Sequence, residues 1–97
     1  MDRDSVIRIL REHEAELRAE GISHVYLFGS VARGEADEAS DVDLFFDYND
    51  PKFSLIDLVS VKERFAEILG RKVDAMTRDS VHRRIRHEVE AEAIPVF

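Results

Sequence analysis

Two stretches decide the fold of this chain: Gly29-Ser30-Val31-Ala32-Arg33-Gly34-Glu35 and Ser40-Asp41-Val42-Asp43-Leu44-Phe45-Phe46. The first follows a run of β-branched and aromatic residues at 22–28, which predicts a strand buried on both faces and ended by Gly29. Residues 30–33 can form a helical turn, and an acidic loop follows over 35–39. The second stretch alternates apolar and acidic side chains, which predicts a strand over 40–46.

Amphipathic helices and one more strand are predicted around this pair of strands. Apolar residues recur at three- and four-residue intervals in each helix. Ser54 opens the middle helix with a capping box, and Gly21 and Gly70 are placed to end the first and middle helices, because glycine accepts a left-handed backbone. The predicted helices span 4–20, 54–69 and roughly 80–93, and the third strand spans 72–76.

The apolar tail at 94–97 is expected to pack back on the core. The element order is then α-β-α-β-α-β-α, which predicts a single α+β domain over residues 1–97.

Composition narrows the class of protein. With 97 residues, 44% hydrophobic and 36% charged, the chain is expected to be a soluble globule with one core. Its net charge of -7 argues against direct binding to nucleic acid or to an anionic membrane. It has no cysteine, which excludes disulfides and thiolate zinc sites. No apolar run is long enough for a membrane helix or a signal peptide, so we expect a cytoplasmic protein.

Three aspartates are candidate metal ligands. Asp41 and Asp43 are two residues apart on a predicted strand, so their side chains point the same way and can hold one hard cation or bridge two divalent ions. The alternative is an exposed strand face, although aspartate is depleted in strands and two close carboxylates repel each other. Asp74 joins the pair if its strand lies beside the second one; otherwise it is an ordinary edge residue.

The glycine turn is a candidate phosphate site. Gly29 and Ser30 stand where a strand meets a possible helix, so backbone N–H groups and a hydroxyl can cradle a phosphate there. Neither the P-loop nor the dinucleotide-binding glycine pattern is present, and a plain turn is the alternative. Arg33 can add a positive charge beside bound phosphates, or it can stabilise the loop by pairing with a carboxylate.

Taken together, the pattern GSxxRG followed by SDxDL resembles the signature of the DNA polymerase beta-like nucleotidyltransferase superfamily. The short chain and the downstream Val73-Asp74 are similar to the minimal nucleotidyltransferases (MNT), which are antitoxins usually paired with HEPN-domain toxins. The signature covers about residues 28–46, and the element order extends the resemblance over the whole chain. The resemblance implies a nucleotidyltransferase-like fold, with a small mixed β-sheet packed with helices.

The resemblance also implies roles for the residues of the signature. The catalytic residues, which would also ligate two Mg²⁺ ions, are Asp41, Asp43 and Asp74. The residues that would bind the nucleotide are Gly29, Ser30 and Arg33. The implied reaction transfers AMP from ATP to a tyrosine hydroxyl of a partner HEPN toxin and releases pyrophosphate. The toxin, typically an RNase, is thereby silenced.

Two other functions remain open. The chain can neutralise its toxin by binding alone, or it can be one subunit of a nucleotidyltransferase that acts on a small-molecule hydroxyl. In each case its length predicts that a second protein completes the site; Phe53, Leu55 and the tail at 94–97 can make that contact or can belong to the core. The basic stretch at 82–87 is interpreted as a solvated helix face.

Overall fold

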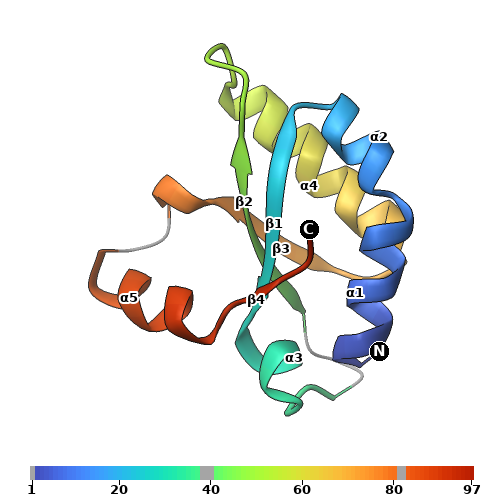
Figure 1. The fold of residues 1–97 in the computed structure, drawn as a ribbon, viewed down its shortest axis with the longest axis vertical. Coiled ribbons are helices and arrows are strands. Elements are labelled where there is room, and N and C mark those ends of the chain that lie inside the picture. Colours follow the sequence, from blue (N-terminus) through green and yellow to red (C-terminus); the bar gives the residue numbers. More distant parts are fainter. Residues whose placement is uncertain (1, 38–40, 81–82) are drawn as a thin grey trace.

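The computed structural model of this chain describes residues 2–37, 41–80 and 83–97 (Figure 1). In chain order the helices are α1 (Arg3–Glu12), α2 (Glu14–Ala19), α3 (Gly29–Arg33), α4 (Leu55–Leu69), the 3₁₀ helix η1 (Arg78–Ser80) and α5 (Arg83–Glu92). The strands are β1 (Ile22–Phe28), β2 (Val42–Tyr48), β3 (Val73–Thr77) and β4 (Ile94–Pro95). This mixture of elements confirms the predicted α+β class.

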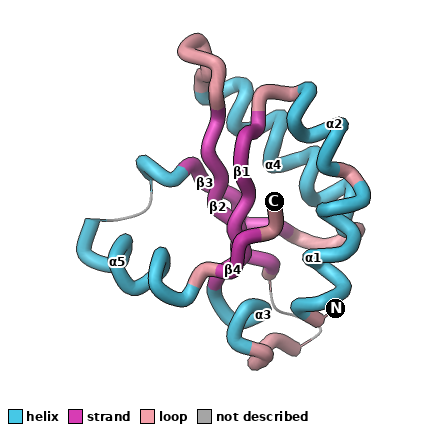
Figure 2. Tube along the Cα trace, in the orientation of Figure 1, coloured by secondary structure: helices cyan, strands magenta, loops and turns pink. Residues whose placement is uncertain are grey.

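The strands form one mixed sheet in the order β3-β2-β1-β4 (Figure 2). β1 pairs antiparallel with both β2 and β4, whereas β2 and β3 run parallel. Parallel neighbours need a crossover connection, and α4 supplies it between β2 and β3. The predicted mixed sheet is therefore confirmed, and its parallel pair joins the strands that carry Asp43 and Asp74.

The two faces of the sheet are covered to different extents. Helices α1, α2 and α4 lie on one face (Figure 1), where Val42, Leu44 and Phe46 of β2 are buried in the main core. On the other face Phe45 packs with Val89 of α5 in a smaller apolar cluster. Because this second cluster is small, the prediction that β1 is buried on both faces was wrong: one face is buried and the other is half-buried.

The predicted first helix is two helices, which corrects the range 4–20. The chain leaves helical geometry at His13, whose φ is -105° and ψ is 12°. The His13 N–H bonds to the Leu10 carbonyl, and its Nδ1 donates to the Ile9 carbonyl at 2.9 Å. The His13 side chain thus bonds to the Ile9 carbonyl, which in a continued helix would accept the His13 N–H. Because that carbonyl is satisfied, α1 can end there.

The second strand and the tail also differ from the prediction. β2 begins at Val42, whose N–H bonds to the Lys72 carbonyl, so Asp41 lies just before the strand instead of inside it. The tail adds an unpredicted edge strand, β4, and its Val96 is buried, which confirms that it packs on the core. The predicted starting residue of the second strand, Ser40, and the loop residues 38 and 39 lie outside the described residues, as do 81 and 82.

The limits of α4 follow the prediction. The Ser54 N–H donates to Asp57 Oδ2 at 2.9 Å, which is half of a capping box, and Gly70 ends the helix with a φ of 63°. α4 presents its buried side to the sheet through Val61, Phe65 and Leu69. Nowhere in the described ranges does a helix combine the length and apolar character needed to cross a membrane.

Candidate active site

Two of the three predicted aspartates lie side by side on neighbouring strands. Asp43 of β2 is the register partner of Asp74 of β3, and parallel partners point to the same face of a sheet roughly 4.8 Å apart. Both lie on the face opposite the main core, since their neighbours Val42 and Val73 are buried in it. Asp41 is half-buried just before β2. The condition that the sequence left open, that the third strand pairs beside the second, is met.

These carboxylates act on one another electrostatically. The pKa of Asp43 is raised above its usual value, first because the carboxyl is partly buried and then because of the negative charges of Asp74 and Asp41. The positive charge of Arg33 opposes the shift without cancelling it. The chain therefore concentrates negative charge at this edge of the sheet and leaves part of it uncompensated.

Lys62 of α4 forms an ion pair with Asp74, and it was missed by the sequence reasoning. Its Nζ lies 4.0 Å from Asp74 Oδ1, and both side chains are about half exposed, so this ion pair is weak. A cavity of about 500 Å³ adjoins the pair and is lined by Asp41, Asp74, Lys62 and Lys72 together with Val59. No sequence signal identifies Lys62, because only the packing of α4 against β3 brings it to this edge.

The chemistry of this donor set fits a hard divalent cation. Carboxylate oxygens are the ligands that Mg²⁺ prefers, and a cation would relieve the repulsion that raises the pKa of Asp43. As the side chains of the described residues lie, no group of three or more acidic, histidine or cysteine side chains is close enough to hold a metal. Asp43 and Asp74 are thus adjacent across the strands, and the three-aspartate metal site stays a prediction.

Gly29 brings the turn after β1 directly against Asp43. Its φ is 76°, in the left-handed region, and a Cβ placed there would overlap the Asp43 carboxylate. Ser30 is half-buried in the first turn of α3, and its carbonyl accepts the Glu35 N–H at 2.9 Å. The predicted phosphate turn and the predicted metal ligand are therefore in contact.

Arg33 pairs with carboxylates on two sides. Its Nε lies 3.0 Å from Glu35 Oε2, and its Nη1 lies 3.2 Å from Glu92 Oε1 on α5. The side chain is 45% exposed. This arrangement corresponds to the loop-stabilising alternative; the predicted contact of Arg33 with a nucleotide stays untested.

Arg78 holds the half-buried face of the sheet together. It donates to both carboxylate oxygens of Asp47, at 2.8 and 3.0 Å, and to Glu90 of α5 at 3.2 Å. Its guanidinium lies over the rings of Tyr26 and Phe45, at 4.8 and 5.3 Å from their centroids. The sequence showed no motif around Arg78, because its partners come from three distant elements.

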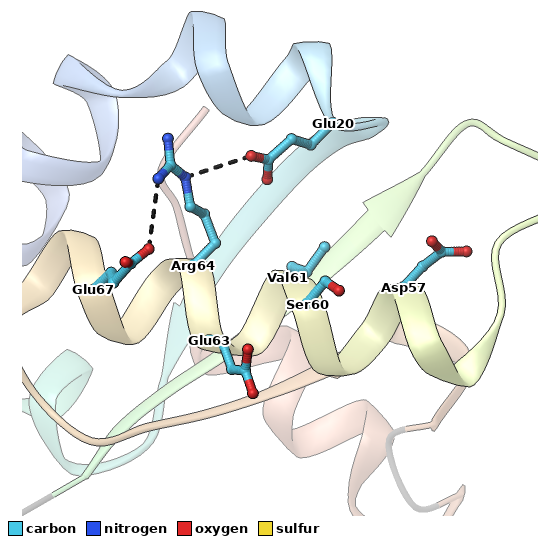
Figure 3. Close-up of a pocket in the computed structure, with 7 residues that line it drawn as sticks. All are labelled: Glu20, Asp57, Ser60, Val61, Glu63, Arg64 and Glu67. Atoms are coloured by element: carbon cyan, nitrogen blue, oxygen red, sulfur yellow. Dashed lines mark ion pairs between the residues drawn. The ribbon is translucent and has the colours of Figure 1, made fainter.

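A second cavity, of about 530 Å³, lies between α4 and the end of α2 (Figure 3). Arg64 stands in its wall and pairs with Glu16 at 2.7 Å, Glu20 at 3.4 Å and Glu67 at 3.5 Å. One guanidinium thus serves three carboxylates and joins α4 to the N-terminal helices. This cavity adjoins a structural brace, and none of the predicted site residues lines it.

The family model and the sequence relatives agree on the kind of protein that this chain resembles. Residues 7–96 match the family model described as a nucleotidyltransferase domain. The protein MJ0435 of Methanocaldococcus jannaschii is 36% identical over 95% of this chain and 90% of its own length. Its name gives protein adenylyltransferase as a candidate activity. The protein adenylyltransferase MntA of Thermococcus cleftensis is 34% identical over 96% of this chain and 94% of its own length.

Solved structures share the fold. One described as a candidate minimal nucleotidyltransferase has a TM-score of 0.80 and 38% identity, covering 98% of this chain and 96% of that one. A toxin-antitoxin structure with AMP-PNP has a TM-score of 0.71 at 21% identity, covering 100% and 73%. The Shewanella oneidensis complex of a tri-AMPylated HEPN toxin with its MNT antitoxin has a TM-score of 0.63 at 18% identity, covering 98% and 68%. At these lower identities the last two similarities concern the fold alone.

Proposed function

The chain belongs to the nucleotidyltransferase domain family, and from this premise we propose that it is a Mg²⁺-dependent protein adenylyltransferase that acts as the antitoxin of a HEPN toxin. It would transfer AMP from ATP to a tyrosine hydroxyl of that toxin. The observation that carries the proposal is the parallel pairing of Asp43 with Asp74 beside the Gly29 turn. The names of the relatives support the transfer of AMP to protein, and the structural neighbours, one with AMP-PNP and one with an AMPylated HEPN toxin, support the nucleotide and the partner.

The residues that would hold the metal are Asp41, Asp43 and Asp74. Bound Mg²⁺ would neutralise these carboxylates and supply positive charge to the phosphate oxygens. Asp43 is partly buried and packed against Gly29, so its position is well defined. Asp74 is about half exposed and lines the open cavity, where an acceptor can reach it.

These different exposures suggest different roles. In the reaction, the acceptor oxygen forms a bond to the α-phosphorus of ATP, and the bond from that phosphorus to the bridging oxygen breaks. Pyrophosphate leaves with the electron pair. Asp74, the accessible carboxylate, takes the proton of the hydroxyl. The N–H groups of the turn at Gly29 and Ser30 face the leaving phosphates in this proposal, because the turn lies against Asp43.

Labelled ATP tests the proposal directly. The chain is incubated with Mg²⁺, ATP labelled at the α-phosphate and the purified product of the neighbouring gene, which the proposal takes to be the HEPN toxin. We expect the toxin to be labelled, and Asp43→Asn to reduce the labelling by about 1,000-fold or more, because a removed metal ligand affects the transition state itself. Glu67→Gln, at the acidic cluster around Arg64, is the matched control and should keep wild-type activity.

The same assay separates the alternatives. If Asp43→Asn labels the toxin as well as wild type does, the catalytic assignment is wrong. If no protein is labelled and the variant still silences the toxin in cells, the chain neutralises by binding alone. If a small-molecule hydroxyl such as that of an aminoglycoside accepts AMP and the toxin does not, the substrate assignment is wrong.

A further inference from the structure

Three apolar side chains of α4 are exposed where nothing in the fold accounts for them. Leu55 and Ile56 are each 79% exposed and Val59 is 56% exposed, and these are the exposed large hydrophobic residues among the described part of the chain. The buried side of the same helix is formed by other residues, Val61 and Phe65 among them. We call Leu55, Ile56 and Val59 the α4 ridge. Its side chains do not contribute to the core.

The ridge is continuous with the candidate active site. Val59 is part of the ridge and also lines the cavity that contains Asp41 and Asp74. On its other side, Leu55 borders a smaller hollow of about 220 Å³ next to Tyr48 and Phe53. A protein that covers the ridge therefore also covers the entrance to the aspartates, and the hollow can receive one of its apolar side chains.

The size of the ridge indicates that it works together with the surface around it. Three such side chains offer on the order of 300 Å² of apolar surface, against roughly 800 Å² per partner in a stable interface. The remaining area must come from adjoining surface, and the cavity beside Val59 provides it on one side. A partner bound here thus contacts the active-site edge itself.

Charge distinguishes between the possible occupants. The residues that line the cavity carry three carboxylates, of Asp41, Glu63 and Asp74, against two lysines, Lys62 and Lys72. A second copy of this chain, with a net charge of -7, would bring the same acidic surface against itself. A partner with an apolar centre and basic flanks is electrostatically complementary.

We propose that the α4 ridge is the docking surface for the acceptor protein, which binds it through an apolar segment flanked by lysine or arginine and so presents its hydroxyl to Asp74. This inference rests on the proposed function and names the surface that delivers the substrate. Docking on the ridge would raise the effective concentration of the hydroxyl at the cavity.

The test uses the double variant Leu55→Ser plus Ile56→Ser, in which both replaced side chains are exposed and neither lines the cavity with the aspartates. The probe is the purified product of the neighbouring gene, the same protein as in the AMP-transfer assay. We expect its Kd to rise roughly 30-fold, and the KM for the toxin to rise with kcat nearly unchanged. The affinity for ATP with Mg²⁺ should stay at the wild-type value. The control is Ala15→Ser plus Ala19→Ser at exposed positions of α2.

Each outcome either supports or overturns the docking role of the α4 ridge. Unchanged Kd and KM in the double variant overturn the inference even if wild type transfers AMP efficiently. A double variant that loses self-association in sedimentation experiments while it binds the toxin normally assigns the ridge to a second copy, which also overturns it. If wild type binds the toxin without transferring AMP, the proposed function fails, and the Kd comparison still tests the ridge.

Discussion

Carboxylates gather at two places in this molecule, and the chain treats the two clusters in opposite ways. At the first, three glutamates share the guanidinium of Arg64 at 2.7 to 3.5 Å. At the second, Asp43 and Asp74 are held side by side by strand pairing, and the Lys62 ammonium lies 4.0 Å from Asp74 with both side chains about half exposed. One cluster contains its own cation; the other keeps a deficit of positive charge.

The two clusters differ in what holds their carboxylates together, and this separates a structural cluster from a candidate functional one. Salt bridges between exposed groups arise easily and contribute little, so the Arg64 cluster is explained by packing between helices. Placing two aspartates on adjacent strands and burying one of them costs stability, as the raised pKa of Asp43 indicates. In our proposal, the binding of a cation compensates for this loss of stability.

The largest effect is expected from Gly29→Ala, which forces the turn away from Asp43. Two penalties add, a left-handed φ of 76° and a Cβ that overlaps the carboxylate, so we expect a loss of about 3 kcal/mol in the free energy of unfolding and of nearly all AMP transfer. Gly34→Ala is the matched control, because its φ is 74° and no atom lies within 4 Å of the added Cβ. It should lose only about 1 kcal/mol. Equal losses in urea unfolding would contradict the role given to the contact.

The second-largest effect is expected from magnesium, which should bind at the aspartates and not at the Arg64 cluster. For an assumed Kd of about 1 mM, 10 mM Mg²⁺ stabilises the native state by about 1.4 kcal/mol, which corresponds to roughly 7 °C in Tm for a chain of this length. We expect this shift in wild type and in Glu67→Gln, and its absence in Asp43→Asn, each measured by calorimetry against NaCl of equal ionic strength. A shift that survives in Asp43→Asn would place the ion elsewhere.

Removing the internal cation should make the first cluster unstable. Arg64→Met leaves Glu16, Glu20 and Glu67 without their shared partner. Because the Arg64 side chain is 36% exposed, solvent screens the repulsion, and we expect a loss of only about 1 kcal/mol in urea unfolding. The control Arg8→Met breaks one exposed pair and should cost less than about 0.5 kcal/mol. AMP transfer should persist in both variants, and its loss in Arg64→Met would show that the brace is more than structural.

The smallest effect concerns pH. The pKa of Asp43 is raised in the native state from its ordinary 3.8, so the folded protein binds more protons than the unfolded chain in the pH range just above that value. Stability is then favoured at low pH and decreases as pH rises through the native pKa of Asp43. In EDTA, the free energy of unfolding of wild type relative to Asp43→Asn should decline over this range. A flat difference would mean that Asp43 is not under electrostatic strain.

Local signals in the sequence predicted the features that local physics decides. The glycine turn at Gly29, the capping box at Ser54 and the bounds of β1 depend on neighbouring residues, and the structure confirms them. The break at His13 was missed because a helical apolar pattern continues past it, and only a side-chain hydrogen bond ends the helix. Placing Asp41 inside the strand was wrong because the ladder begins one residue later.

Features that need distant partners could not be predicted. Lys62 reaches Asp74 only because α4 crosses over to β3, and Arg78 meets Asp47 and two aromatic rings from separate strands. The same holds for the edge strand β4, whose two residues carry little β-sheet signal of their own. The family signature predicted Asp41 and Asp43 as candidate ligands, but the residues that surround them are brought there by tertiary packing.

The parallel pairing of β2 and β3 also makes enzymatic activity a reporter of correct folding. A slip of β3 by one residue would turn Asp74 toward the helices and expose Ala75 in its place, because successive side chains of a strand point to opposite faces. Such a misregistered chain could retain the same helices and much of its compactness, yet Asp74 would no longer lie on the same face as Asp43. Catalysis in this family member therefore depends on the register of β3, and an insertion or deletion between Gly70 and Val73 is expected to reduce activity more sharply than a loss of core volume does.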